Sequence, residues 1–243
     1  MRIELKKIQA AFNLLLFYCN GKLKQEEIEK VKNTFRRAGK MRELQLVISG
    51  LGKVKDDNEH AAKILLHFMK KKERKAEKKF REYFESTGKD ELKELKKIML
   101  TAAEEFGQIN LTYFDELVSQ IITLEKKMNR TDNELHQLRK LLKEFGYNIV
   151  LLCEEDKEKY LDLFPSEATE KLEKLIGVWH DETIFRKRIK KAHSKFISEI
   201  DNTKKQNESK QFLFKLERES SRKIKEEKAE LEQLIKSKKE SDD

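Results

Sequence analysis

Apolar residues recur at helical spacing along the segment 134–152, which reads ELHQLRKLLKEFGYNIVLL. They follow one another at steps of three and four residues, and they are Leu135, Leu138, Leu142, Phe145, Ile149 and Leu152. Such steps place every member on one face of an α-helix, because that helix has about 3.6 residues per turn. The segment is therefore predicted to form an amphipathic helix.

A row of basic residues runs beside this apolar face. His136, Arg139 and Lys143 are spaced i, i+3 and i+7, so their side chains share one strip of the helix. The N-terminal sequence MRIELKKIQAAFNLLL repeats the pattern at a shift of 137 residues, with Arg2 at the place of Arg139 and Lys6 at that of Lys143. A packed core requires a repeated apolar face, but it does not require the same basic positions beside it. The duplication therefore marks the basic row as a candidate site.

A second pair of segments repeats at nearly the same shift. LIGVWHDETIFRKRI, in the second half of the chain, corresponds to FRRAGKMRELQLVISGL in the first half. The corresponding residues, at a shift of 138, are Gly177 with Gly39, His180 with Arg42, and Asp181 with Glu43. Two motifs in the same order, each duplicated, indicate an internal repeat.

Helical patterns cover most of the remaining chain, and none predicts a strand. Gly39, Gly177 and the segment 86–88 are expected to break helices. Thr131 and Glu134 have the spacing of a capping box, which is expected to start the helix at 134–152. The predicted fold class is all-α, and two copies of a helical unit with one apolar face each are expected to pack as one elongated helical bundle.

Composition narrows this prediction. Charged residues make up 41% of the chain and hydrophobic residues 37%, with one proline and eight glycines. This polarity approaches that of a disordered chain, but the regular apolar spacing favours long folded helices with solvated faces. Lys and Arg total 54 against 45 Asp and Glu, a net charge of +9. The excess is moderate, so its effect depends on whether the basic groups gather on one surface.

The sequence also predicts a compartment. No apolar run approaches the roughly 20 residues that span a bilayer, and the charged N-terminal segment is unlike a signal peptide. Cys19 and Cys153 lie among apolar residues, so we expect buried free thiols, as in a reducing compartment. We therefore expect a cytoplasmic protein without a membrane partner.

The two motifs resemble those of the CHAD family, the conserved histidine α-helical domain. The first motif continues to Tyr147 before an aliphatic run, and the second has the Gly-x-x-His-Asp turn at Gly177. The resemblance runs over about 1–196, and it implies a bundle built from two pseudo-twofold helical repeats whose basic first helices face a shared surface. We expect a single CHAD-like domain over 1–243, with repeat one over about 1–110, repeat two over about 111–236 and a frayed tail at 237–243.

The family binds inorganic polyphosphate, and the resemblance carries this role to basic positions of the chain. An arginine fork can bind two phosphate oxygens, lysine adds a point charge, and histidine donates a hydrogen bond or adds charge. The positions that match the motifs are Arg2, Lys6, Lys7, His136, Arg139 and Lys143 from the first motif, and Arg42 and His180 from the second. The flanking positions are Arg36, Arg37, Lys40, Lys187, Arg188, Lys190 and Lys191. Glu43 and Asp181 are expected to orient basic neighbours or to cap helices.

The resemblance implies binding without catalysis and without a cofactor. We expect inorganic polyphosphate or a similar polyanion to lie along a basic groove between the two repeats, and sulfate or phosphate to occupy the same site. The chain departs from the family at four positions. Glu144 and Gly146 stand where the family often has Arg or Lys, Arg42 replaces a histidine, and Arg2 is so near the start that the histidine before it is missing. The basic strip is thinner, which lowers the expected affinity or removes the function.

Other interpretations of the basic row remain open. A basic strip on an amphipathic helix is usually its solvated face. Nucleic acid is the nearest competing ligand, because phosphate charge alone gives non-specific, salt-dependent attachment. Proteins that bind single strands interleave aromatic residues with basic ones, whereas Phe12, Phe17, Phe145 and Phe164 fall on predicted apolar faces. Specific nucleic-acid binding is therefore not expected.

One alternative is an enzyme. His136, His180, Asp181 and Asp201 follow the order H…HD…D, which resembles the metal-dependent HD phosphohydrolases. In those all-helical enzymes two His and two Asp hold a divalent metal that activates water. The first half of the chain would have no role in such a site.

A purely structural role is the remaining alternative. The charged helices predicted at 59–85 and 209–235 would then bind partner proteins, with no preference for phosphate. Binding assays with phosphate polymers separate this role from the first.

Overall fold

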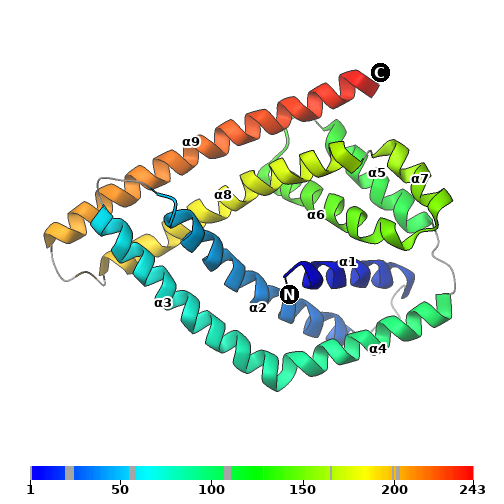
Figure 1. Ribbon diagram of the computed structural model, residues 1–243, viewed down its shortest axis with the longest axis horizontal. Coiled ribbons are helices and arrows are strands. Elements are labelled where there is room, and N and C mark those ends of the chain that lie inside the picture. Colours follow the sequence, from blue (N-terminus) through cyan, green and yellow to red (C-terminus); the bar gives the residue numbers. More distant parts are fainter. Residues whose placement is uncertain are drawn as a thin grey trace. The chain divides into compact units, whose positions relative to one another are not determined.

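The computed structural model is helical throughout the parts of the chain that it describes (Figure 1). The described residues are 2–19, 25–54, 59–106, 111–127, 129–164, 166–198, 200 and 203–242. The helices are α1 (Arg2–Cys19), α2 (Gln25–Leu51), α3 (Glu59–Tyr83), η1 (Phe84–Gly88), α4 (Lys89–Phe106), α5 (Thr112–Lys126), α6 (Asp132–Asn148), η2 (Ile149–Leu151), α7 (Glu154–Leu163), α8 (Ser166–Ser198) and α9 (Thr203–Asp242). The predicted all-α class is confirmed.

The prediction that Gly39 and Gly177 end helices is wrong. The helix α2 runs through Gly39, and α8 runs through Gly177. A glycine inside a helix costs only about 1 kcal/mol relative to alanine, and the apolar contacts of a long helix outweigh that cost. The predicted break at 86–88 coincides with η1, a π-helical turn that separates α3 from α4.

Gly39 and Gly50 lie in the same helix and should respond in opposite ways to alanine. A Cβ at Gly39 meets nothing within 4 Å, whereas at Gly50 it would lie 2.7 Å from Cε2 of Phe185, a buried ring on α8. We expect Gly39→Ala to stabilise the fold by about 0.5–1 kcal/mol. We expect Gly50→Ala to destabilise it by about 1–3 kcal/mol, because the added methyl would force the buried ring of Phe185 to shift. Urea unfolding of both variants measures the difference, and equal shifts would contradict it.

The helices form two compact units, which are described separately. Unit 1 comprises Met1–Phe35, Thr87–Gly177 and Leu231–Asp243, and unit 2 comprises Arg36–Ser86 and Val178–Glu230. Each unit draws on both predicted repeats, because unit 1 crosses the predicted boundary near residue 110 and unit 2 combines segments from either side of it. The helix α9 continues to Asp242, through most of the segment that was expected to be frayed.

The core of unit 1 uses the apolar face that the sequence shows. The helix α6 packs against both α1 and α5 (Figure 1). All six residues of the predicted stripe are buried, namely Leu135, Leu138, Leu142, Phe145, Ile149 and Leu152. On α1, Phe12 and Leu15 are buried and cluster with Leu95 of α4. The duplicated first helices therefore bury their apolar faces in the same unit.

The core of unit 2 brings together the helices of the second motif. Val47 of α2, Leu65 of α3, Phe185 of α8 and Leu213 of α9 belong to one buried cluster. Val47 and Phe185 occupy corresponding positions at the 138-residue shift. The two copies of the second motif thus pack on one shared core, as the copies of the first motif do in unit 1.

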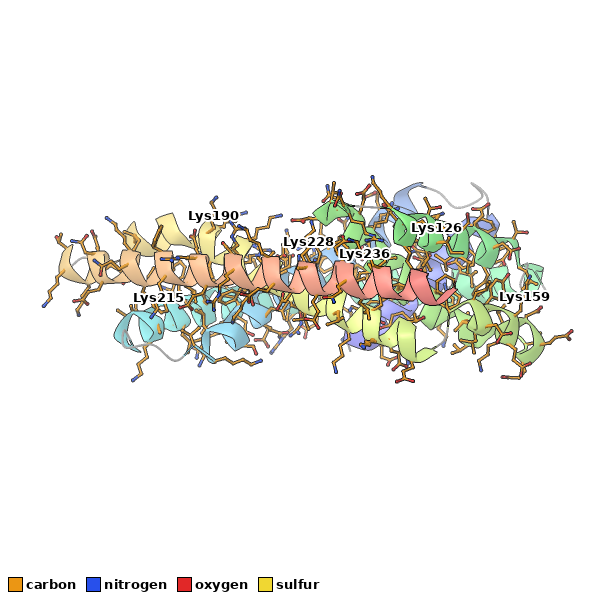
Figure 2. All side chains as sticks on the ribbon, turned by 90° about the horizontal axis from the view of Figure 1, so that it is seen from above. Lys126, Lys159, Lys190, Lys215, Lys228 and Lys236 are labelled. Carbon is orange, nitrogen blue, oxygen red and sulfur yellow. The ribbon has the colours of Figure 1, made fainter. Side chains whose placement is uncertain are left out.

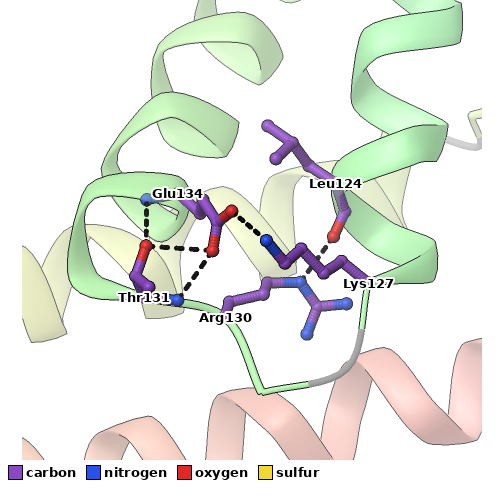
Figure 3. Close-up of polar contacts among 5 residues, drawn as sticks. All are labelled: Leu124, Lys127, Arg130, Thr131 and Glu134. Carbon is purple, nitrogen blue, oxygen red and sulfur yellow. Dashed lines mark hydrogen bonds and ion pairs between the residues drawn. The ribbon is translucent and has the colours of Figure 1, made fainter.

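A polar loop fixes the start of α6 (Figure 3). The hydroxyl of Thr131 accepts from the backbone N–H of Glu134, and the Glu134 carboxylate accepts from the backbone N–H of Thr131 at 2.9 Å. The predicted capping box is therefore confirmed. Lys127 also donates to Glu134, and this bond, with those from Thr131, lowers the pKa of the Glu134 carboxyl to about 2. Arg130 reaches back to donate to the carbonyl of Leu124 at 2.6 Å.

Cys153 is exposed, which corrects the expectation of a buried thiol. The backbone is extended at Leu152 and at Cys153, the N-cap of α7, so the thiol leaves the apolar face that ends at Leu152. The thiol Sγ lies 3.0 Å from Oδ2 of Asp156. The side chain of Cys19 falls outside the described residues.

Candidate functional site

The two copies of the first motif contact each other directly in unit 1. Asn13 of α1 donates to Glu144 of α6 at 2.7 Å, and Asn148 of α6 donates to the backbone carbonyl of Ala10 at 3.1 Å. Tyr113 of α5 joins the same network: its hydroxyl donates to Glu144 at 2.6 Å and accepts from Asn148 at 2.9 Å. The duplicated helices are thus held by a buried polar network as well as by apolar contacts.

This network explains one departure from the family pattern. Glu144 stands where the family often has a basic residue, and here its carboxylate anchors Asn13 and Tyr113. Burial and the hydrogen bond to Glu144 raise the pKa of the Tyr113 phenol, so the hydroxyl stays protonated and donates. An acid therefore lies at the contact between α1 and α6.

Three cationic or protonatable side chains gather on the first half of α6. Burial, Lys140 and Arg139, in that order, lower the pKa of His136 below its usual value. Both neighbours therefore lie close enough to act on the imidazole. Arg139 and His136 are half-buried, whereas Lys140 is exposed. Sequence reasoning missed Lys140, although its i+4 spacing from His136 places it on the same strip.

The guanidinium of Arg139 lies against the backbone of α8. A Cβ on Gly177 would be 3.7 Å from Nε and from Nη2 of Arg139, which is ordinary contact distance. Gly177 is therefore compatible with the arginine but not required by it. The Nε atom of Arg139 is buried and has no hydrogen-bond partner among the described residues. A buried donor without a partner is costly.

The other first-motif residues differ in their surroundings. Lys143 is held in an ion pair with Glu173 of α8. Lys6 is half-buried, and exposed Lys7 lies 3.7 Å from Glu4 on the next turn. The side chain of Arg2 falls outside the described residues. Lys143 is therefore partly neutralised, and its contribution to anion binding requires that the ligand compete with a carboxylate.

The second motif brings α2 and α8 together in unit 2. Arg188 of α8 donates through Nε and Nη2 to the Glu43 carboxylate of α2. This contact agrees with the expectation that Glu43 orients a basic neighbour. Nε of Arg42 is buried without a hydrogen-bond partner in the described part of the chain, and half-buried His180 lies beside the ring of Trp179. Arg42 in unit 2 and Arg139 in unit 1 thus share one feature, a buried Nε atom without a hydrogen-bond partner among the described residues.

The flanking basic residues of unit 2 are at its surface. Arg37 places its guanidinium 4.2 Å from the ring centre of Tyr83. The exposed members are Arg36, Arg37, Lys40, Lys187, Lys190 and Lys191. Exposed lysines also occur on α5, α7 and α9, where Figure 2 labels Lys126, Lys159 and Lys215. The presence of exposed lysines therefore does not by itself locate the binding site.

The predicted site residues divide between the two units. Unit 1 holds Arg2, Lys6, Lys7, His136, Arg139 and Lys143. Unit 2 holds Arg36, Arg37, Lys40, Arg42, His180, Lys187, Arg188, Lys190 and Lys191. In each unit, both copies of one motif contribute.

The residues of the enzyme interpretation also divide. His136 belongs to unit 1, His180 and Asp181 belong to unit 2, and Asp201 falls outside the described residues. Among the side chains that the structure describes, no group of three or more His, Cys, Asp or Glu is placed to hold a metal ion.

Comparison with known proteins identifies the family. The sequence profile of the CHAD domain matches residues 1–190. Because this match covers well over half of the chain, the protein belongs to the CHAD family. Searches of curated proteins and of solved structures found no match. No helix in the described ranges has a stretch long and apolar enough to cross a bilayer.

Proposed function

We propose that the protein binds inorganic polyphosphate or a similar polyanion through the basic residues of its duplicated motifs, without catalysing a reaction. One observation carries the proposal: both copies of each motif pack together, α1 with α6 and α2 with α8. The duplication repeats cationic positions on helices that contact each other. Family membership supports the same ligand.

The environment of Arg139 suits a phosphate oxygen. Its guanidinium is half-buried and makes no ion pair with any described acid, and Lys140 and His136 lie beside it. Hydrogen bonds from a cation to an anion are stronger in such a partly desolvated position than in water. A chain of phosphates offers an oxygen to each cation in turn, so modest contacts add up through multivalency.

Nucleic acid fits these surfaces less well. The rings of Phe12, Phe145 and Phe164 are buried in the core, so bases have no access to them. Stacking on exposed aromatic rings is a main source of affinity for single strands. Polyphosphate has no bases to stack, so the burial of these rings does not weaken its binding.

The proposed function is tested by competition among three ligands. Long-chain polyphosphate, pyrophosphate and RNA of matched total charge are titrated against the protein at one fixed salt concentration, because counterion release strengthens all three at low salt. We expect polyphosphate to bind tightest, and pyrophosphate weakest because it reaches few cations. Equal affinity for RNA and polyphosphate, or no binding of either, would refute the proposal.

The affinity should also depend on pH through His136. Before ligand binding, burial and two neighbouring cations lower the pKa of the His136 imidazole, so it is neutral near pH 7. Bound phosphates favour the charged form and raise that pKa, so binding takes up a proton and the affinity rises as the pH falls from about 7. A bound pKa one unit higher would give up to about tenfold. Calorimetry in buffers of different ionisation enthalpy counts the protons taken up.

The control for this prediction is a histidine that lies elsewhere. His67 is exposed on α3, and His67→Gln should keep the pH dependence. His136→Gln should lose it. Equal pH dependence in both variants would assign the effect to the ligand and not to His136.

A further inference from the structure

A ridge of lysines runs along α3, outside the duplicated motifs. Lys71, Lys75 and Lys79 are spaced every four residues, and Tyr83 is the next position on the same ridge. Each step rises by about 6 Å, and residues at this spacing are neighbours on the helix surface. All three lysines are exposed. The ridge is therefore a row of neighbouring cations that turns gradually around the helix.

Two other cations of α3 form ion pairs with acids on the same helix. Lys78 lies 3.9 Å from Glu82, and Arg81 lies 2.9 Å from Glu77. In contrast, Lys71, Lys75 and Lys79 form no ion pair with any side chain that the structure describes. The ridge thus keeps its charge available for a ligand.

The ridge leads to the cations of the second motif. Its last position, Tyr83, lies under the guanidinium of Arg37, 4.2 Å from the ring centre. Arg37 belongs to α2, and Arg36 and Lys40 are its exposed neighbours on that helix. Both helices lie in unit 2. The lysines of α3 and the cations of α2 therefore continue one another.

The surroundings of the ridge indicate which polyanion fits. The apolar side of α3 is buried in the core of unit 2 through Leu65, Phe68 and Met69, so the helix has no apolar face to insert into a membrane. The ridge carries no exposed aromatic ring, since half-buried Tyr83 lies against Arg37, so bases have no stacking surface. A flexible chain of phosphates needs neither feature.

We propose that the ridge Lys71–Lys75–Lys79 is a second polyphosphate-binding row, which extends the α2 cations and makes the protein select long chains. This inference rests on the proposed function. A short phosphate chain covers only a few cations of either row. A long chain reaches the α2 cations and the ridge at once. After it binds one of these rows, its contact with the other is intramolecular, so the affinity rises with chain length.

The test compares two triple variants of α3. Lys71→Ala, Lys75→Ala and Lys79→Ala together remove the ridge. Lys70→Ala, Lys78→Ala and Arg81→Ala remove the same charge from other positions of the same helix, with the same gain in helix propensity. Long-chain polyphosphate, triphosphate and RNA are titrated against the full chain and both variants at one salt concentration. We expect the ridge variant to bind the long chain at least about tenfold more weakly, whereas the control variant changes by less than about threefold.

Triphosphate separates this inference from the proposed function. Its affinity should change by less than about threefold in either variant. Equal losses of long-chain affinity in the two variants would overturn the inference, because the effect would then be one of net charge. A ridge variant that loses only RNA affinity would overturn it too, and would assign the ridge to nucleic acid. If the ridge variant binds like wild type while Arg139→Ala weakens binding, the inference fails and the proposed function stands. If wild type does not bind, both fail.

Discussion

Replacing Arg130 with alanine should destabilise unit 1 by about 3–5 kcal/mol, the cost of breaking a buried ion pair from one side. The Arg130 side chain is 2% exposed. It donates to the carbonyls of Leu124 and Glu125 at the end of α5 and to the carboxylate of Glu232 in α9. Without it, two carbonyls and a largely buried carboxylate lose their partner. Thermal unfolding should show a decrease in Tm of roughly 10 °C.

Two further variants separate this effect from a general loss of charge. Arg81→Ala removes an exposed arginine that pairs with Glu77 within α3, and such a pair contributes only about 0.5 kcal/mol. Arg130→Met combined with Glu232→Met should recover much of the lost stability, because an apolar pair of similar volume replaces the ion pair. An Arg130→Ala variant within about 1 kcal/mol of wild type would show that this arginine does not connect α9 to the α5–α6 loop.

The largest effect on binding is expected for the pair Arg139→Ala and Lys140→Ala. These are the two cations of α6 beside His136, and neither forms an ion pair with a described acid. Each charge-assisted hydrogen bond to an anion contributes about 1.5–3 kcal/mol, so polyphosphate affinity should fall by about 100-fold or more. Fluorescence anisotropy with labelled long-chain polyphosphate measures the loss.

The matched control lies on another helix of the same unit. Lys96 and Lys97 of α4 are also adjacent and exposed, so their double alanine variant removes the same charge. It should bind within about threefold of wild type, since these lysines lie outside both motifs and screened surface charges contribute little. Equal losses in the two variants would mean that only the net charge matters.

The sequence predicts best where one physical requirement dominates. The stripe from Leu135 to Leu152 is buried as expected. In an all-helical chain, an apolar face at helical spacing is stabilised by packing into the core. The Thr131–Glu134 capping box is present because it depends on local spacing alone. The helices α1 and α6, which carry the two copies of the first motif, contact each other.

The sequence predicts less well where long-range contacts compete. Gly39 and Gly177 carry a local helix penalty of about 1 kcal/mol, which the tertiary contacts of α2 and α8 override. The roles of Glu144 and Glu173 depend on partners far away in the chain, Asn13 and Lys143 respectively. Spacing along one helix does not reveal which acid from another helix neutralises a cation, so the thinning of the basic strip was only partly predictable.

The most direct test of the central claim follows the arginine Nε–H groups by NMR while polyphosphate is added. If the duplicated motifs bind the polymer, the signals of Arg139 and Arg42, whose Nε atoms are buried without a described partner, should shift together and saturate. The signals of Arg81 and Arg222, which pair with acids on their own helices, should stay in place. Shifts confined to Arg81 and Arg222, or spread evenly over all arginines, would contradict the account.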